Sequence, residues 1–337
     1  MAKRSGNTSS ALTMARNAKN DEFYTQLSDI EKELNHYQEQ FRDKIVFCNC
    51  DDPFKSNFFR YFALNFNTLG LKKLMASCLA SCYTQMSGKP LKIEISEVTE
   101  GAGLAKVECL LRNRKNRLTP LQGDGDFRSP ECVELLKQSD VVVTNPPFSL
   151  FREFVAQLEE HEKEFLILGN VNAVTYKEIF KRIKENKIWL GESIQSGDRK
   201  FLVPDHYPLD AAGCGIDENG CRFIRVKGVR WFTNIPVKTS KRHKELTLSR
   251  RYTPSEYPKY DHYDAIEVSQ VAAIPVDYDG VMGVPITFLD KYNPEQFEIL
   301  GLDDHRFAYP AWRGRGPDLN GKPVYRRVII RKRKREQ

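Results

Sequence analysis

The sequence predicts an α/β fold built around a mostly parallel β-sheet. Short apolar runs rich in β-branched residues, such as 141–144 and 164–171, alternate with segments such as 149–162, in which apolar residues recur at helical spacing. Parallel strands need a crossover connection, so this alternation is typical of βαβ units with helices on both faces of the sheet. With 337 residues, the chain is long enough for one large domain with additions or for two domains.

The expected elements alternate along the first two thirds of the chain. Strands are expected at 43–50, 71–78, 88–98, 104–111, 140–147, 164–171, 188–193, 220–226 and 229–237. Helices are expected at 28–41, 57–70, 129–139, 149–162 and 175–187. The last two strands are candidates for antiparallel pairing.

The composition changes near residue 236. Beyond it, prolines, tyrosines and charges increase, and regular helical periodicity is scarce. We therefore expect three parts: a flexible basic arm at 1–20, the α/β domain at 21–235, and a smaller, irregular β and loop region with a basic tail at 236–337.

The net charge of +7 is unevenly placed. Basic clusters interleaved with tyrosines occupy 237–263 and 325–337. Such clusters suit a polyanionic partner such as nucleic acid, although a solvated surface with a soluble tail explains them equally well.

The sequence gives no sign of a membrane or a metal site. No apolar run approaches the length of a membrane span, and the N-terminus lacks the apolar core of a secretory signal. The eight cysteines form no C-x-x-C pair, and the six histidines are scattered. We expect a cytoplasmic protein with free thiols and no metal.

The strand at 140–147 ends in an unusual tip, Asn145-Pro146-Pro147-Phe148. Proline rings fix φ and remove N–H donors, so the tip is stiff and presents acceptors: the side-chain carbonyl of Asn145 and the backbone carbonyl of Pro146. Phe148 adds an aromatic plate. Ligands bind at the carboxyl ends of strands in open α/β sheets, which makes this tip the candidate catalytic site. The alternative is a stiff strand-exit turn without chemistry.

Two rigid acceptors beside an aromatic ring match the exocyclic amine of a nucleobase. Accepting both amine hydrogens, at Asn145 and Pro146, favours a tetrahedral nitrogen with an available lone pair. Positive charge develops on that nitrogen during methyl transfer, and preorganised acceptors stabilise it more than the neutral ground state. Stacking of the base on Phe148 contributes roughly 1–3 kcal/mol.

The tip resembles the catalytic motif of amino-group methyltransferases that use S-adenosylmethionine. Residues 15–330 as a whole are similar to the adenine-specific DNA methyltransferases of the EcoRI restriction–modification type. The motifs that carry this resemblance, in order, are ARNAKNDEFYTQ, CNCDDPFKSNFF, GDGDFRS, VVVTNPPFSLFREF, NVNAVTYKEIF, ENKIWLG and GVMGVPITFLDKYNPEQFEILG. The resemblance implies a Rossmann-like methyltransferase sheet followed by a C-terminal target-recognition region.

The resemblance also implies a binding site for S-adenosylmethionine. The methionine end would contact Phe23, Tyr24 and Thr25. Asn49, Asp51 and Asp52 stand where methyltransferases usually carry a glycine-rich turn, and either aspartate could receive the ammonium group. Asp124, Asp126 and Phe127 would line the adenine of the cofactor. The second strand ends without a carboxylate for the ribose, so that contact stays unassigned.

As substrate, the resemblance implies double-stranded DNA, with the target adenine flipped into the pocket. The recognition sequence would be GAATTC or a related one, shared with a cognate restriction endonuclease that forms no stable complex with the methyltransferase. An asymmetric single chain that methylates one strand at a time is compatible with a monomer. Trp231 and Phe232 stand at the end of a late strand, where the family places an aromatic residue near the flipped base; the alternative is that they pack in the core. Basic residues that could contact DNA are Lys238, Lys241, Arg242, Arg313, Arg315, Arg326 and Arg327.

Two alternatives stay open at this point. The same pocket would serve a methyltransferase acting on cytosine N4, an RNA base or a glutamine amide. The chain could also be an inactive DNA-binding protein on a methyltransferase scaffold, which would have no need to bind the methyl donor.

Overall fold

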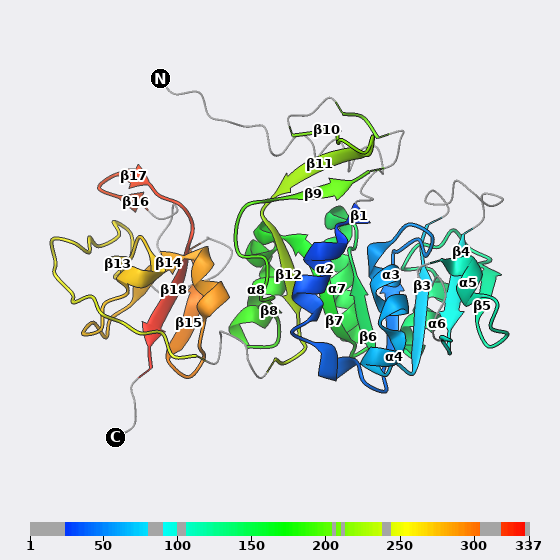
Figure 1. Cartoon of the computed structure of the whole chain (residues 1–337). Coiled ribbons are helices and arrows are strands. Elements are labelled where there is room, and N and C mark those ends of the chain that lie inside the picture. The colour runs from blue at the N-terminus through cyan, green and yellow to red at the C-terminus, as the bar shows by residue number, and fades with distance from the viewer. Residues whose placement is uncertain are drawn as a thin grey trace. The chain divides into compact units, whose positions relative to one another are not determined.

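The computed structural model describes residues 24–79, 90–99, 106–203, 207–209, 213–237, 244–303 and 318–333 (Figure 1). The chain divides into two compact units. Unit 1 comprises residues 1–173 and 196–235, and unit 2 comprises residues 174–195 and 236–337.

Unit 1 is an α/β structure. Its strands are β1 (Tyr24–Thr25), β2 (Ile45–Asn49), β3 (Lys73–Ser77), β4 (Leu91–Ile95), β5 (Arg117–Pro120), β6 (Val141–Thr144), β7 (Glu164–Asn170), β9 (Asp198–Leu202), β10 (Gly215–Ile216), β11 (Arg222–Lys227) and β12 (Val229–Thr233). Its α-helices are α2 (Leu27–Leu34), α3 (Asn57–Leu64), α4 (Phe66–Leu69), α5 (Val107–Leu110), α6 (Pro130–Gln138) and α7 (Phe151–Glu160). The 3-10 helices η1 (Gln38–Phe41) and η3 (Phe148–Leu150) are also in unit 1, and η4 (Val171–Thr175) spans the division between the units.

The main sheet of unit 1 has a mixed topology. Its strands lie in the order β5-β4-β3-β2-β6-β7-β12. β2 pairs in parallel with β3 and β6, and β6 with β7, whereas β4, β5 and β12 pair antiparallel. The chain runs outward from β2 to β3 and returns through α6 to β6 on the other side of β2. The strand order therefore reverses at β2 and β6, which is where open α/β sheets bind their ligands.

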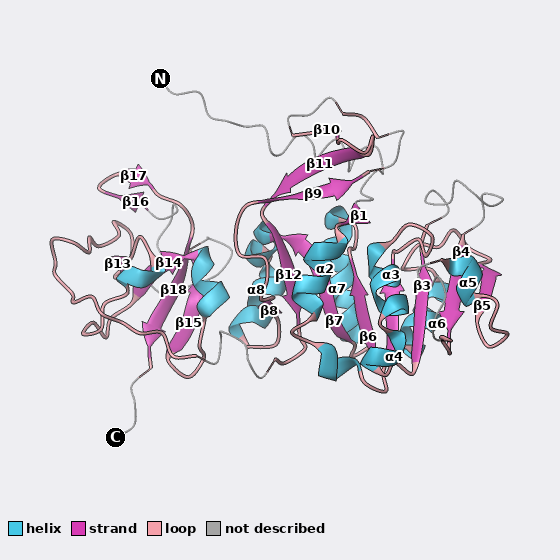
Figure 2. Cartoon of the chain, viewed as in Figure 1, coloured by secondary structure: helices cyan, strands magenta, loops and turns pink. Residues whose placement is uncertain are grey.

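Helices cover both faces of this sheet (Figure 2). Successive side chains of a strand point to opposite faces. On β12, Trp231 packs edge-on against Phe58 of α3, with ring centroids 5.9 Å apart, and the adjacent Phe232 packs against Phe151 of α7 at 5.0 Å. Both aromatic side chains are buried, so α3 and α7 lie on opposite faces.

A small antiparallel sheet in the order β1-β9-β11-β10 completes unit 1. Tyr24 pairs with Leu202, and Thr25 with Phe201, so the start of the described chain lies beside a strand far along the sequence. Figure 1 shows β9 and β11 beyond the upper ends of the main strands. β11 leads directly into β12 through Gly228, whose backbone carbonyl accepts from the Val171 N–H at the end of β7.

Unit 2 is a smaller β-rich structure with one α-helix in its described part. It contains α8 (Lys177–Lys184), β8 (Trp189–Leu190), β13 (Ile266–Glu267), β14 (Met282–Pro285), β15 (Phe297–Leu302), β16 (Asp318–Leu319), β17 (Lys322–Pro323), β18 (Arg327–Lys332), and the 3-10 helices η6 (Val271–Ala273) and η7 (Ile286–Lys291). One sheet has the order β13-β14-β18-β15, and β16 pairs with β17. Residues 174–195, which the sequence placed within 21–235, group with unit 2 because α8 packs on β15 and β8 on η7.

The predicted α/β class is confirmed, as is the antiparallel pairing of β12. The strand expected at 104–111 is wrong, because 107–110 form the short helix α5. There, Asn116 donates its amide to the Leu110 carbonyl, and the apolar Val107 and Leu110 are buried at helical spacing. Of the strand expected at 188–193, only Trp189–Leu190 forms. Strands β5 and β9 were missed, because both are rich in polar residues and lie outside the apolar pattern.

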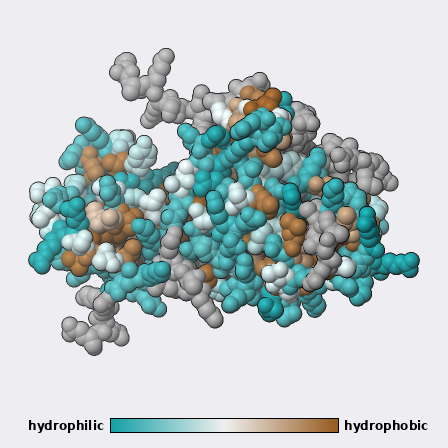
Figure 3. All heavy atoms as spheres, in the orientation of Figure 1, coloured by the Kyte–Doolittle hydropathy of each residue, from teal (hydrophilic) through white to brown (hydrophobic). Residues whose placement is uncertain are grey.

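The face shown in Figure 3 is mainly hydrophilic, with small separate apolar patches. Large apolar residues with substantial exposure include Ile216 and Tyr325. Among the described residues, no helix has both the length and the apolar character that a membrane span needs.

Candidate functional site

The turn after β2 is the first part of the site. Asn49, Asp51 and Asp52 are all buried there, although each is polar. Cys50 has φ 75°, in the left-handed region that favours glycine. The turn therefore has the backbone conformation of a glycine turn although it contains no glycine. The sequence does not reveal this, because the usual G-x-G pattern is absent.

The turn after β2 is fixed to its neighbouring strands. The Asp51 N–H donates to the Ser77 carbonyl at the end of β3 (2.9 Å), and Thr144 Oγ1, at the end of β6, donates to the Asn49 carbonyl. The carboxyl ends of β3, β2 and β6 are therefore tied together at the point where the strand order reverses.

One glycine allows the loop at 123–128 to lie against the carboxyl ends of the same strands. Gly125 has φ 81°, and a Cβ added there would lie 2.2 Å from the backbone carbonyl oxygen of Cys78. Only glycine permits this approach of the loop to the residue that follows β3. The carboxylate of Asp124 accepts the Asp126 N–H at 3.0 Å and shapes the turn.

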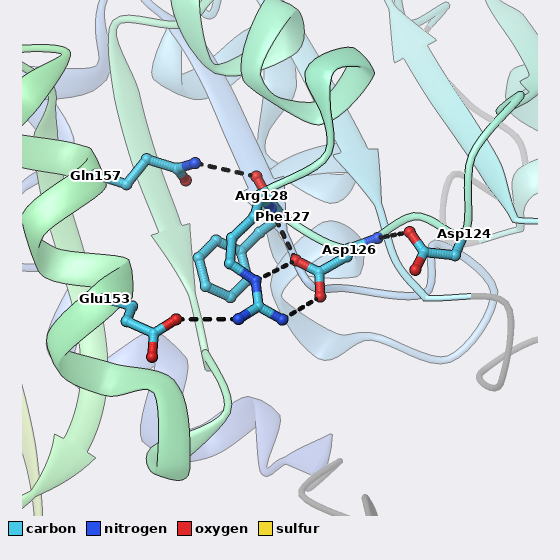
Figure 4. A network of polar contacts seen from close by, with 6 residues as sticks. All are labelled: Asp124, Asp126, Phe127, Arg128, Glu153 and Gln157. Carbon is cyan, nitrogen blue, oxygen red and sulfur yellow. Dashed lines mark hydrogen bonds and ion pairs between the residues drawn. The ribbon is translucent and has the colours of Figure 1, made fainter.

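Figure 4 shows that Asp126 and Arg128 form the centre of a polar network on this loop. Arg128 donates to both carboxylate oxygens of Asp126, from Nε at 2.9 Å and Nη2 at 2.7 Å, and to Glu153 Oε2 of α7 at 3.0 Å. The hydrogen bonds from Arg128 lower the pKa of Asp126, so this carboxyl stays ionised. Phe127 is buried edge-on against Phe154, and its carbonyl accepts from Gln157.

The Asn145-Pro146-Pro147-Phe148 tip follows β6 directly, as the sequence predicts. Pro146 is buried, and Asn145, Pro147 and Phe148 are partly exposed. Phe148 begins η3, which continues into α7. The tip thus stands at the carboxyl end of a fully buried strand, between the turn after β2 and the end of β7.

Strand β1 brings Tyr24 and Thr25 to this unit. The Thr25 carbonyl accepts from Asn57 Nδ2 at the start of α3, at 2.7 Å. Ser56 caps the same helix, with its Oγ accepting from the Phe58 and Phe59 N–H groups. β1 and the turn after β2 therefore meet at the N-terminus of α3.

Two buried polar atoms test whether a methyl donor fits. Thr25 Oγ1 and Asn49 Nδ2 have no hydrogen-bond partner among the described residues. Leaving a buried donor or acceptor unsatisfied is costly, so such atoms mark places where a ligand can supply the missing partner. Both residues were expected to contact S-adenosylmethionine, and both fit a polar amino-acid end.

Asp51 is the most perturbed carboxyl group of the site. Burial is the largest cause and raises its pKa, the contacts with Ser56 and Thr144 lower it, and the charge of Asp52 raises it again, which places the pKa at about 7. Burial also raises the pKa of the Cys50 and Cys48 thiols well above their usual range, so neither is a nucleophile at neutral pH.

The candidate DNA contacts lie in unit 2 and differ in their surroundings. Arg326 is exposed. Arg327 is nearly buried and forms an ion pair with Glu267 at 2.5 Å. Its side chain is therefore engaged inside unit 2 and is not presented to DNA. The remaining candidates lie outside the described residues, as does Phe23: they are Lys238, Lys241, Arg242, Arg313 and Arg315.

Several residues of the site were not anticipated from the sequence. The polar groups of the site are contacted by Ser56, Ser77, Thr144 and Arg128. The three hydroxyl residues carry no sequence pattern that separates them from ordinary turn residues, and Arg128 carries none that separates it from a surface arginine. Trp231 is completely buried against α3, in the core. Within the described part of the chain, no group of three His, Cys, Asp or Glu residues could hold a metal ion.

Comparison with known proteins identifies the family. The family described as "Adenine-specific methyltransferase EcoRI" matches residues 11–333. The chain is 47% identical to the Type II methyltransferase M.EcoRI of Escherichia coli, over 97% of this chain and 98% of that protein. It is 40% identical to M.MpnI of Mycoplasma pneumoniae (95% and 97% covered) and 38% identical to M.MgeORF184P of Mycoplasma genitalium (94% and 97% covered), both Type II methyltransferases.

These matches confirm the resemblance that the ordered motifs indicated, and they do not favour the inactive scaffold. They also imply a methyl donor of the S-adenosylmethionine type. The chain belongs to the EcoRI family of adenine-specific methyltransferases.

Proposed function

We propose that this enzyme transfers the methyl group of S-adenosylmethionine to the N6 amine of an adenine within a specific double-stranded DNA sequence. The observation that carries the proposal is the position of the Asn145 tip. It follows a buried parallel strand at the point where the strand order reverses, and it is tied through Thr144 to the turn that carries Asn49.

The residues of the tip act on the target amine. Asn145 Oδ1 and the Pro146 carbonyl accept its two hydrogens, which directs the nitrogen lone pair toward the methyl group, while Phe148 stacks on the base. The bound donor supplies an electrophilic methyl on a sulfonium. The N–C bond forms as the S–C bond breaks, and the amine proton leaves to water.

The donor is proposed to lie along the carboxyl edge of β2 and β3. Asn49 Nδ2 would donate to the methionine carboxylate, and Thr25 Oγ1 would accept from the ammonium group, together with Phe23, Tyr24 and one of the two aspartates of the turn. The 123–128 loop would bind the adenine of the donor, and Asp124, Asp126 and Phe127 would line that adenine. The seating of that loop by Gly125 supports this placement.

The DNA contacts are proposed from charge. Flipping the adenine out of the duplex brings it to the tip, and cationic side chains grip the phosphates on either side. Arg326 is the exposed candidate of the described part. The proposed target is GAATTC or a related sequence. The methyltransferase is proposed to act as a monomer. Its methylation would protect the DNA against an endonuclease of the same specificity, with which the methyltransferase forms no stable complex.

The test follows a tritium-labelled methyl group from S-adenosylmethionine into unmethylated plasmid DNA. The product is digested to nucleosides and separated. We expect label in N6-methyldeoxyadenosine from the wild type, almost none from Asn145→Ala, and undiminished label from Asn219→Ala, a matched change in an exposed turn. Label in another nucleoside would change the substrate, and no label with intact DNA binding would refute the enzyme assignment.

A further inference from the structure

A chain of contacts links the catalytic strand to the start of α3 through Asp51. Ser56 Oγ donates to Asp51 Oδ1 at 2.6 Å, and Thr144 Oγ1 lies 2.5 Å from Asp51 Oδ2. Thr144 is the residue immediately before Asn145, and its hydroxyl also contacts the Asn49 carbonyl. The side chains of Asp51, Ser56 and Thr144 are all buried.

Counting hydrogens shows which form of Asp51 fits this arrangement. The Ser56 oxygen accepts from two backbone N–H groups at the helix start, so its own hydrogen goes to Asp51. The Thr144 hydroxyl has one hydrogen, and the Asn49 carbonyl can only accept. If Thr144 donates to Asn49, the hydrogen between Thr144 and Asp51 must belong to Asp51. An ionised Asp51 would leave one of the two contacts at Thr144 without a hydrogen.

We propose that Asp51 is a positioning residue that works as a neutral carboxylic acid: it donates to Thr144 Oγ1, accepts from Ser56, and so holds the Asn145 tip against β2 and α3. This assignment rests on the proposed role of Asn145 in methyl transfer. It separates the two aspartates of the turn, because Asp51 then serves the tip, and Asp52 is left as the carboxylate for the donor's ammonium group.

The surroundings of Asp51 agree with a neutral group. In the described part of the chain, the titratable groups coupled to Asp51 by charge include Asp52 and the thiols of Cys48 and Cys50. One of these is acidic and the other two are uncharged thiols, so none of these described groups offsets a negative charge on Asp51. Burying an ionised carboxylate without a cation is costly, which favours the protonated form.

The decisive variant is Asp51→Asn. An asparagine can reproduce the neutral acid, because its carbonyl accepts from Ser56 and its amide donates to Thr144. In the wild type, ionisation of Asp51 should lower kcat about tenfold or more between about pH 6 and about pH 9. In Asp51→Asn, the ratio of these two kcat values should stay within about twofold, with the donor KM changed little.

Three further variants give the matched comparisons. Thr144→Val removes the hydroxyl and should lower kcat at both pH values, whereas Thr144→Ser should restore most of it. Asp52→Asn should raise the donor KM and retain the alkaline loss of kcat. If Asp51→Asn instead raises the donor KM about tenfold at every pH and keeps the alkaline loss, Asp51 is a donor ligand and the proposal fails.

A second measurement needs no methylation and therefore separates this proposal from the proposed function. The pKa of Asp51 lies above its usual value, so its contribution to stability is present at acid pH and is lost as pH rises toward about 7. The melting temperature of the wild type should therefore fall relative to Asp51→Asn between about pH 4 and about pH 8. A difference that does not change with pH would show that Asp51 is ionised throughout, and would overturn the proposal.

Discussion

The guanidinium of Arg327 pairs with the carboxylate of Glu267 at 2.5 Å, inside unit 2. Glu267 also accepts from Tyr260, and the Arg327 backbone carbonyl accepts from the Asp303 N–H. The pair thus joins β13 to β18, beside the exposed Arg326. Neighbouring arginines in one sequence run therefore have different surroundings.

The two arginines should respond differently to substitution. Arg327→Ala leaves Glu267 buried without its cation, so we expect unfolding to become easier by about 3–5 kcal/mol, measured by urea denaturation. Arg326→Ala should leave stability unchanged and weaken DNA binding, with the slope of log K against log salt reduced by about 1. Equal loss of stability in both variants would contradict this division.

Cys50 should be a position where glycine is better than alanine. A φ of 75° costs any residue that has a Cβ roughly 1–3 kcal/mol of backbone strain. We expect Cys50→Gly to be more stable than Cys50→Ala by about 1 kcal/mol in urea denaturation, the reverse of the usual order of these residues. An advantage for alanine would show that the turn relaxes out of the left-handed conformation.

Gly125 should be needed to bind the methyl donor. Gly125→Ala places a Cβ against the Cys78 carbonyl and must displace the 123–128 loop, so the donor Kd in calorimetry should rise about tenfold or more. Gly123→Ala is the matched control in the same loop, because the nearest atom that its Cβ would meet among the described residues is Ser129 Cβ, at 3.9 Å. Similar affinities in both variants would remove the loop from the donor site.

The pairing of Arg128 with Asp126 should set an acid limit on donor binding. Arg128 lowers the pKa of Asp126, so the contribution of the ionised carboxyl is present above its usual pKa and is lost as pH falls through the lowered value. In Arg128→Gln, that loss should begin at higher pH, measured as donor Kd against pH. Glu153→Gln leaves the Asp126 contact in place, so its profile should follow the wild type.

The sequence predicts the fold class and the position of the Asn145 tip because both rest on strong local patterns. The run Val141–Thr144 is apolar on both faces, as buried parallel strands are, and two prolines mark its end unmistakably. Strand β9 carries three charged residues, so only its pairing with β1 and β11 reveals it as a strand.

The rest of the site could not be read in this way, because it depends on contacts between distant residues. Asp51 was expected to bind the donor, yet its partners Ser56 and Thr144 come from a helix cap and from another strand. Nothing in the local sequence around Asp51 indicates that its second oxygen faces β6. Likewise, Arg327 looks like any surface arginine until its partner Glu267, far along the chain, is known.

The pairing of β1 with β9 has a consequence for protein synthesis. Tyr24 and Thr25 leave the ribosome early, whereas Phe201 and Leu202, their partners, emerge after the whole parallel part of the sheet. A nascent chain can therefore assemble β2, β3, β6 and β7 before β1 has a strand to join. The half-made chain would already carry the Asn145 tip before β1, which holds two of the residues proposed to bind the donor, can pair, and its small sheet would be complete only once β9 and β11 have been translated.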